Sequence, residues 1–306
     1  MFTTITPVQN ILSISSHVVH GNVGNDAIQF PLNLRNWNVD CINTTNLSAH
    51  PGHGVFTGGK EKAKLVGDLF QGLKELLLDD EYQAVIIGYV ASSENLQVIW
   101  NDILTQFTRK NVVKVMDPVI GDNGKVYVSQ EIVDLYLELL GRNEIDIDLL
   151  TPNMFEIEVL TGIKINSWET VKKSIDVFCA KYMRVKNLVI TSVTIDGKMY
   201  CVGSSKGKSF YYKVSEVDAI FSGSGDLFLA LLTDELVKNE QVLAVSVCKT
   251  INVVTDVLNM SYQLLKDDCT TKRNANGKLY IPDLKLVESK NILVRDVEVI
   301  EPTYLN

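Results

Sequence analysis

The sequence predicts an α/β fold with a mostly parallel central sheet, helices on both faces of that sheet and an antiparallel hairpin at one edge. Three observations support this prediction. Short apolar runs alternate with apolar stripes at helical spacing, a polar or glycine-bearing turn follows each run, and a hairpin pattern follows the last one. Because the chain has neither internal repeats nor a low-complexity linker, we expect a single domain over residues 1–306.

The expected strands are short apolar runs, typical of strands that are buried on both faces. They are Ile11–Ile14, Val39–Ile42, Ala84–Ile87, Val112–Met116, Ile147–Leu150 and Leu188–Ile190. After these, Met199–Val202 and Ser209–Val214 flank the turn Gly203–Lys208, which predicts the antiparallel edge hairpin.

The expected helices fill the intervals between the strands. In the first, Lys60–Leu78, helical spacing places Leu65, Leu69, Leu73, Leu76 and Leu77 on one face. The others are Asn95–Phe107, Gln130–Leu140, Val171–Tyr182, Asp226–Val237 and Val242–Leu265, the last with a break left open. The pattern does not place Leu284–Asn306, which is polar with scattered valines.

Composition and charge argue against several classes of protein. The net charge is −8, without the basic excess of a nucleic-acid binder, and no apolar run approaches the roughly 20 residues of a membrane span. Residues 1–10 lack the pattern of a secretory signal. The five cysteines are widely spaced, without a C-x-x-C pair, as expected of reduced thiols. We therefore expect a cytoplasmic protein and leave the nucleus open as a second location.

The segment Asp218–Leu232 carries the strongest chemical signal. Gly223, Ser224 and Gly225 form a tight turn before an apolar helix, whose free N–H groups can hold phosphate oxygens. Asp226 follows at the start of that helix, either as a general base for an attacking hydroxyl or as an ordinary capping carboxylate. The loop is not a Walker A motif, because no G-K-[ST] occurs in the chain.

Other segments extend this signal along the chain. They are Ser16-His-Val-Val-His-Gly-Asn-Val-Gly-Asn25, Gly88-Tyr89, Asp117-Pro-Val-Ile-Gly-Asp122, Thr151-Pro-Asn-Met-Phe-Glu156, Ile190-Thr-Ser192 and Leu286-Val-Glu-Ser289. In this order and combination the chain resembles the pyridoxal kinases, within the ribokinase-like kinases. The resemblance covers nearly the whole chain. Taken singly, each segment also has a purely structural interpretation, such as a strand end or a helix cap.

The resemblance implies ATP-dependent phosphorylation of the 5′-hydroxymethyl group of pyridoxal, pyridoxine or pyridoxamine, in vitamin B6 salvage. It implies that Asp226 is the base and that the amides of Gly223, Ser224 and Gly225 hold the γ-phosphoryl group. The implied substrate-binding residues are Ser16, Val23, His50, Tyr89 and Asp226.

The resemblance also implies the nucleotide and cation contacts. ATP would lie against Asp117, Tyr127, Asn153, Glu156, Thr191, Ser192, Gly223 and Phe228, under a lid formed by Gly121–Tyr127. Mg²⁺ would be oriented by Asp117, Asn153 and Glu156, and K⁺ would bind near Asp117, Thr151 and Thr191. A homodimer is expected.

Two departures from the family pattern concern affinity and closure. Ser48-Ala-His-Pro-Gly-His53 has Pro51 where relatives often have a threonine that can touch the substrate, and the lid is shorter than in some relatives.

Three alternatives remain open. A hydroxymethylpyrimidine kinase would share the preference for a flat ring, a sugar kinase would need more polar groups, and a non-catalytic relative would have lost the base or the glycines. The four histidines, His17, His20, His50 and His53, lie close together in the sequence, but we expect turn and pocket residues rather than a transition-metal site, with His17 and His20 on either side of a turn.

Overall fold

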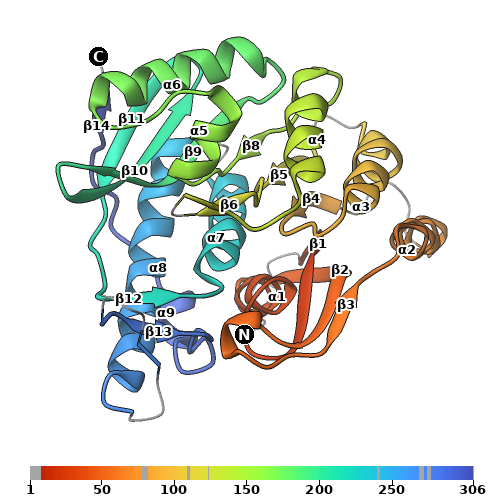
Figure 1. Ribbon diagram of the computed structural model, residues 1–306, viewed down its shortest axis with the longest axis horizontal. Coiled ribbons are helices and arrows are strands. Elements are labelled where there is room, and N and C mark those ends of the chain that lie inside the picture. The colour runs from red at the N-terminus through yellow and green to blue at the C-terminus, as the bar shows by residue number, and fades with distance from the viewer. Residues whose placement is uncertain are drawn as a thin grey trace, which may run out of the picture.

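The computed structural model describes residues 8–76, 82–108, 111–122, 124–239, 242–268, 272–273 and 277–305. Its main feature is a ten-stranded sheet in the order β14-β11-β10-β9-β8-β5-β4-β1-β2-β3. The central strands β1 (Gln9–His20), β2 (Trp37–Ala49), β4 (Tyr82–Ile87), β5 (Val113–Met116), β8 (Leu149–Leu150) and β9 (Asn187–Ile195) are parallel. The predicted fold class is therefore confirmed (Figure 1).

The edges of the sheet are antiparallel. β10 (Lys198–Ser205) and β11 (Lys208–Lys213) form the predicted hairpin, and β14 (Thr303–Leu305) pairs with β11. At the other edge β3 (Gly58–Lys60) pairs with β2. Two small ladders lie outside the sheet: β12 (Ala219–Phe221) with β13 (Leu279–Ile281), and β6 (Gly121–Asp122) with β7 (Lys125–Val126).

Helices cover both faces because side chains alternate along each strand. On one face Leu12, Val85 and Ile87 pack against the helices from α2 to α6. On the other face Ile11, Ala84 and Ile86 pack against α1 and the helices from α7 to α9. The bounds are α1 Asn25–Leu34, α2 Ala63–Leu76, α3 Ser93–Val98, α4 Gln130–Gly141, α5 Met154–Thr161, α6 Trp168–Lys181, α7 Ser224–Lys238, α8 Leu243–Leu265 and α9 Lys290–Leu293.

The predicted helices differ from the observed ones in several of their bounds. α2 begins at Ala63, because Lys60 belongs to β3. The helix predicted from Asn95 begins at Ser93, since the Ser92 side chain accepts a hydrogen bond from the Asn95 N–H, and it continues as a π turn over Ile99–Ile103 and a 3₁₀ turn over Leu104–Gln106. α8 is unbroken.

The predicted leucine face of α2 is largely exposed. Leu65, Leu69 and Leu76 are 42%, 47% and 81% exposed, whereas Val66 and Phe70 are buried. Leu73 packs partly against the core, and Leu77 lies outside the described residues. In Figure 1, α2 stands at the periphery of the molecule, beyond α3 and β3. Part of the apolar surface of α2 is therefore not covered by the rest of the domain.

α8 is long and apolar enough, by length and composition, to cross a membrane, which the sequence analysis did not anticipate. Its apolar side chains Leu243, Val247, Val253 and Val257 are buried in the core on the α1 and α7 face. The apolar character of α8 is thus explained by packing inside the domain.

A buried ion pair joins α1 to α7. The Arg35 guanidinium lies 2.6 Å from Asp234 Oδ2 and 2.5 Å from Glu235 Oε1, and the exposed fractions of the Arg35 and Asp234 side chains are 6% and 0%. Trp37 Nε1 donates to Asp234 Oδ1 at 2.7 Å, and Arg35 Nε donates to the Leu293 carbonyl at 2.7 Å. The network fixes the relative position of the two helices whose N-termini form the site described below.

Replacing Arg35 should destabilise the fold strongly. We expect Arg35→Met to lower the free energy of unfolding by about 3 kcal/mol, because Asp234 would keep a buried charge without its main partner. Urea unfolding followed by circular dichroism measures this change. The matched control is Lys64→Met, which breaks the exposed pair with Asp68 and should cost less than about 1 kcal/mol. Equal losses in both variants would contradict the assignment.

Candidate active site

The site lies where the direction of the sheet order changes. From β1 the chain proceeds outward to β2, whereas β4, β5, β8 and β9 follow on the opposite side of β1. In open α/β sheets, ligands bind beyond the carboxyl ends of the strands at such a switch point. Gly88, Asp117 and Thr151 directly follow the carboxyl ends of β4, β5 and β8, whereas Ser16 and Thr191 lie within β1 and β9.

Asp226 occupies the centre of this region. Its Oδ2 accepts a hydrogen bond of 2.9 Å from the Gly24 N–H, in the turn between β1 and α1. A Cβ at Gly88, after β4, would lie 3.9 Å from Asp226 Oδ1. Burial raises the pKa of Asp226 to about 6, although the Gly24 N–H favours the ionised form. The carboxylate is thus held at the switch point with a pKa suited to accepting a proton near neutral pH.

The turn before α7 has the geometry of an anion site. Gly223 precedes the helix with φ of 81°, a left-handed conformation that glycine adopts without strain. A side chain there would meet the Asn22 carbonyl oxygen at 2.3 Å and Val23 Cγ1 at 3.2 Å. α7 begins at Ser224, so the first amides of a fifteen-residue helix lie in this turn, where they can bind phosphate oxygens.

Asp117 faces the same turn from the end of β5. Its Oδ2 lies 3.8 Å from the Cβ position of Gly225. Burial, together with the neighbouring Glu156 and Asp226 carboxylates, raises the pKa of Asp117 well above its usual range. Three acidic groups therefore influence one another electrostatically at this point, and a cation would relieve their repulsion.

Asn153 and Glu156 do more than the sequence indicated. The two form a capping box at the start of α5: Asn153 Oδ1 accepts from the Glu156 N–H at 2.9 Å, and Glu156 Oε2 accepts from the Asn153 N–H at 2.8 Å. Glu156 Oε1 also accepts from the Ile120 N–H at 2.8 Å, and Asn153 Nδ2 donates to the Gly121 carbonyl at 2.7 Å. Both side chains therefore anchor the base of the predicted lid.

The segment predicted as a lid contains the short ladder of β6 and β7. Tyr127 follows it, with its N–H donating to the Ile120 carbonyl at 2.8 Å and its side chain 58% exposed. Burial of the Glu156 side chain, 2% exposed as a residue, raises its pKa to about 7 against three backbone N–H donors that favour the ionised form. Loss of the Glu156 carboxylate would remove the hydrogen bonds to the Asn153 N–H at the start of α5 and to the Ile120 and Gly121 N–H groups before β7.

The predicted substrate residues lie on the β1 side of Asp226. Ser16 is packed against Gly24, where a Cβ would meet Ser16 Oγ at 2.4 Å, and Val23 is buried beside Gly223. Tyr89 follows β4; its carbonyl accepts from the Thr44 hydroxyl at 2.7 Å, and burial raises the pKa of its phenol. Ser16 and Val23 thus lie against Gly24 and Gly223, the glycines beside Asp226, and Tyr89 directly follows Gly88, whose Cβ position lies near the same carboxylate.

The other predicted ATP and cation residues lie on the β8 and β9 side. Thr151 is buried, with its N–H donating to the Met116 carbonyl at 3.0 Å, and the Thr191 N–H donates to the Pro152 carbonyl at 3.0 Å. Thr151 directly follows β8, and Thr191 and Ser192 lie within the neighbouring strand β9. Phe228 is 7% exposed and belongs to the core, so the structure gives it a packing role.

The histidines are arranged differently from the prediction. His17 and His20 both belong to β1 and do not straddle a turn. His17 Nδ1 lies 2.9 Å from Asp26 Oδ2, and His53 Nε2 lies 2.8 Å from Asp283 Oδ2. Across the described ranges, no group of three or more histidine, cysteine or acidic side chains is arranged to hold a metal ion by itself.

Four residues that contribute to the site were given no role from the sequence. Gly24 and Gly88 make the close approaches to Ser16 and Asp226, and both lie within the quoted motifs, so a signal was present. Ser222 and Tyr280 meet His50 through contacts between distant parts of the chain, for which the sequence offers no local signal.

A buried carboxylate and a glycine turn at a helix N-terminus, together at the switch point of a parallel sheet, define a small-molecule kinase of the ribokinase-like class. Comparison with known proteins narrows this class. The family described as phosphomethylpyrimidine kinase matches residues 57–272. A putative pyridoxal kinase of Saccharomyces cerevisiae is 36% identical over 313 residues, covering 97% of this chain and 96% of the relative.

Further relatives agree. The pyridoxal kinase of Homo sapiens is 31% identical, covering 94% of this chain and 95% of the relative. Pyridoxal kinase from Leishmania donovani, in complex with ADP and pyridoxamine, superposes with a TM-score of 0.83 at 26% identity, covering 97% and 100% of the two chains. The chain belongs to the pyridoxal kinase family.

The close approach at Gly24 can be tested directly. Its φ is +56°, and a Cβ would lie 2.2 Å from the Ser16 carbonyl oxygen. We expect Gly24→Ala to displace the N–H that binds Asp226 and to lower the free energy of unfolding by about 2 kcal/mol, with activity reduced at least tenfold. Gly72→Ala is the control, because nothing lies within 4 Å of its Cβ position in α2. That variant should be as stable as the parent or more so. A Gly24→Ala protein that matches it would refute the close-approach argument.

Proposed function

We propose that the chain transfers the γ-phosphoryl group of ATP to the 5′-hydroxymethyl group of pyridoxal, pyridoxine or pyridoxamine, in vitamin B6 salvage. The main support for this proposal is the position of Asp226, which accepts a hydrogen bond from the Gly24 N–H beside the glycine turn at the start of α7. The pyridoxal kinase of Leishmania donovani binds ADP together with pyridoxamine, and in another structure ADP together with pyridoxine. These ligands support the same pair of substrates for this chain.

Asp226 removes the proton of the primary alcohol as the alcohol oxygen attacks the γ-phosphorus. The bond from that phosphorus to the oxygen bridging it to the β-phosphate breaks, ADP leaves, and the proton stays on Asp226 until water removes it. The N-terminal amides of α7 stabilise the negative charge that develops on the transferred group. The lid, anchored by Glu156 and Asn153, excludes water as a competing acceptor.

Mg²⁺ fits the carboxylates of the site. The Asp117 carboxylate has no hydrogen-bond partner among the described residues and faces two other acidic groups. Mg²⁺ is commonly held by one or two carboxylates, several waters and the substrate phosphates, so a preformed cage of protein ligands is unnecessary. In this proposal Asp117 orients the cation, and Glu156 acts through its hold on the lid. Bound Mg²⁺ would neutralise charge on the phosphates.

K⁺ fits the neighbouring strand ends. Thr151 and Thr191 bring hydroxyl and carbonyl oxygens to adjacent positions after β8 and within β9, next to Asp117 at the end of β5. Oxygen ligands of this kind suit a hard monovalent cation.

The second candidate acceptor is hydroxymethylpyrimidine, since the matching family is described as phosphomethylpyrimidine kinase. The acceptor side of the site, with Tyr89, Val23 and Ser16, suits a flat heteroaromatic ring and not a sugar with many hydroxyls. The full-length relatives at 31% and 36% identity are pyridoxal kinases, one of them putative, and therefore favour the B6 vitamers.

The proposal makes Asp226 indispensable. With MgATP, K⁺ and pyridoxal, the protein should form pyridoxal 5′-phosphate, measured by its absorbance, and Asp226→Asn should lower kcat by about 10²–10⁴-fold. Since the base must be ionised, kcat/KM should fall as the pH decreases through about 6, the raised pKa of Asp226. Glu169→Gln, on α6, is the control and should keep full activity. Turnover of hydroxymethylpyrimidine alone would overturn the proposed acceptor, and an active Asp226→Asn protein would overturn the proposed base.

We also propose that the protein is a cytoplasmic homodimer. The support for a dimer is the exposed apolar surface near the β3 edge: Leu65 and Leu69 on α2, together with Val55 and Phe56 in the loop before β3, which are 81% and 47% exposed. An exposed apolar surface of this kind is a common feature of a subunit interface. For the cytoplasm, the support is that Cys41, Cys179, Cys201 and Cys248 are free thiols.

A charge on this surface should separate the subunits. We expect Leu69→Glu to shift the protein from dimer to monomer in sedimentation velocity, because a buried unpaired carboxylate opposes association. Val287→Glu introduces the same charge at a 61% exposed valine of the C-terminal segment and should leave the dimer intact. A parent protein that sediments as a monomer would refute the homodimer, and a dimeric Leu69→Glu protein would place its interface elsewhere.

A further inference from the structure

Three side chains from distant parts of the chain meet beside the glycine turn. The Ser222 hydroxyl lies 2.7 Å from the Tyr280 hydroxyl and 3.3 Å from His50 Nδ1. The Tyr280 hydroxyl lies 3.4 Å from the same nitrogen. Tyr280 is separated from His50 by 230 positions in the sequence, so the cluster exists only in the folded chain.

The small parallel ladder outside the main sheet creates this meeting. Ile220 of β12 pairs with Tyr280 of β13, and the Ser222 N–H donates to the Ile281 carbonyl at 3.0 Å. Ser222 is the residue directly before Gly223, the first glycine of the anion turn. The ladder therefore attaches the C-terminal segment to the turn that holds the transferred phosphoryl group in the proposed reaction.

The hydrogen bonds define the tautomer of His50. The Gly52 N–H donates to His50 Nδ1 at 3.2 Å, and a backbone N–H can only donate. Nδ1 is thus an acceptor, and in the neutral imidazole the proton lies on Nε2. Burial lowers the pKa of His50, with Asp283 opposing and His53 adding to this effect, which favours the neutral ring. Among the described residues Nε2 has no hydrogen-bond partner, so it presents a free N–H donor.

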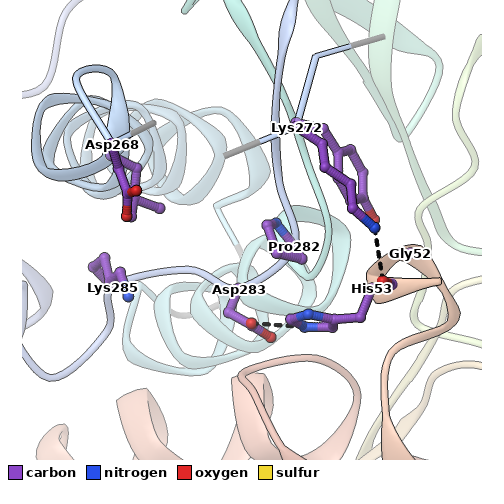
Figure 2. Close-up of a pocket in the computed structure, with 9 residues that line it drawn as sticks. Gly52, His53, Asp268, Lys272, Pro282, Asp283 and Lys285 are labelled. Atoms are coloured by element: carbon purple, nitrogen blue, oxygen red, sulfur yellow. Dashed lines mark hydrogen bonds and ion pairs between the residues drawn. The ribbon is translucent and has the colours of Figure 1, made fainter. Parts of the chain in front are cut away.

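The turn that carries His50 is held from outside by the C-terminal segment. Lys272 Nζ donates to the His53 carbonyl at 2.8 Å, and Asp283 Oδ2 pairs with His53 Nε2 at 2.8 Å. Figure 2 shows Lys272 and Asp283 reaching His53 from different sides across a small cavity of about 240 Å³. These two contacts hold His53, at the end of the turn that begins after His50.

We propose that Ser222 and Tyr280 are positioning residues for the acceptor. Tyr280 donates to Ser222, and Ser222 donates to His50 Nδ1, so that the imidazole presents its Nε2–H donor to an acceptor oxygen on the ring of the bound substrate. This inference rests on the proposed function and extends it: the C-terminal segment contributes to binding of the alcohol substrate and not to the phosphoryl chemistry.

Steady-state kinetics test the proposal. We expect Tyr280→Phe and Ser222→Ala each to raise KM for pyridoxal about threefold to tenfold, the effect of weakening one hydrogen bond, with kcat and KM for ATP within about twofold of the parent. Because the two hydroxyls act in series, KM for pyridoxal in the double variant should be no higher than in the single variant with the larger increase. Tyr304→Phe, at an exposed tyrosine of β14, is the matched control and should change nothing.

The outcomes separate this inference from the proposed function. A parent protein that does not phosphorylate any B6 vitamer would refute the proposed function itself. If the parent is active but KM for pyridoxal is unchanged in both variants, or kcat falls instead of KM rising, the positioning role is overturned. Equal additive losses in the double variant would overturn the serial arrangement.

A second measurement does not depend on turnover. ¹⁵N imidazole shifts of the parent, with His50→Gln used to assign the resonance, should report the tautomer with the proton on Nε2. A proton on Nδ1 at neutral pH would overturn the proposal whatever the kinetics show.

Discussion

The hydrogen bond from the Gly24 N–H to Asp226 is the constraint on which the rest of the site depends. It joins two helix N-termini, those of α1 and α7, across the switch point of the sheet. The contact requires three positions without side chains. Gly24 approaches Ser16, Gly88 approaches Ser15 and Asp226, and Gly223 approaches the Asn22 carbonyl. The Arg35 network joins the same two helices away from their N-termini, so the buried ion pair and the site both depend on how α1 and α7 are packed.

Electrostatics add a second constraint. Asp117, Glu156 and Asp226 are all buried, and burial raises the pKa of each carboxyl group. The Glu156 and Asp226 carboxylates add to burial in raising the pKa of Asp117, a repulsion that a cation bound with the nucleotide, as proposed above, would relieve. The same groups divide their tasks by their hydrogen bonds. Asp226 accepts a hydrogen bond from the Gly24 N–H, and Glu156 accepts from the Ile120 and Asn153 N–H groups. The Asp117 carboxylate has no hydrogen-bond partner among the described residues.

Much of this was predictable from the sequence, because the information is local. Apolar runs predicted the central strands, and the glycine turn before an apolar helix predicted the anion site with Asp226. Periodicity failed where side-chain burial was decided by the tertiary structure. It placed Leu65 and Leu69 on one apolar helix face but could not show that this face is largely exposed, and it did not detect α1, which contains Pro31. The contacts of His50 with Ser222 and Tyr280 could not be predicted, since the three residues are far apart in the chain, although His50 and Ser222 both lie in segments that the sequence singled out.

The ladder of β12 and β13 has a consequence for how the protein is made. Most of the parallel sheet, the glycine turn and Asp226 are complete once the ribosome has synthesised about the first 240 residues, yet Tyr280 and Asp283 emerge near the end of translation. A nascent chain can therefore form the glycine turn and position Asp226 early, whereas the C-terminal residues that contact His50 and His53 are added last. If the proposed positioning role holds, full affinity for the alcohol substrate, and the full stability that its binding confers, is reached only in the finished polypeptide.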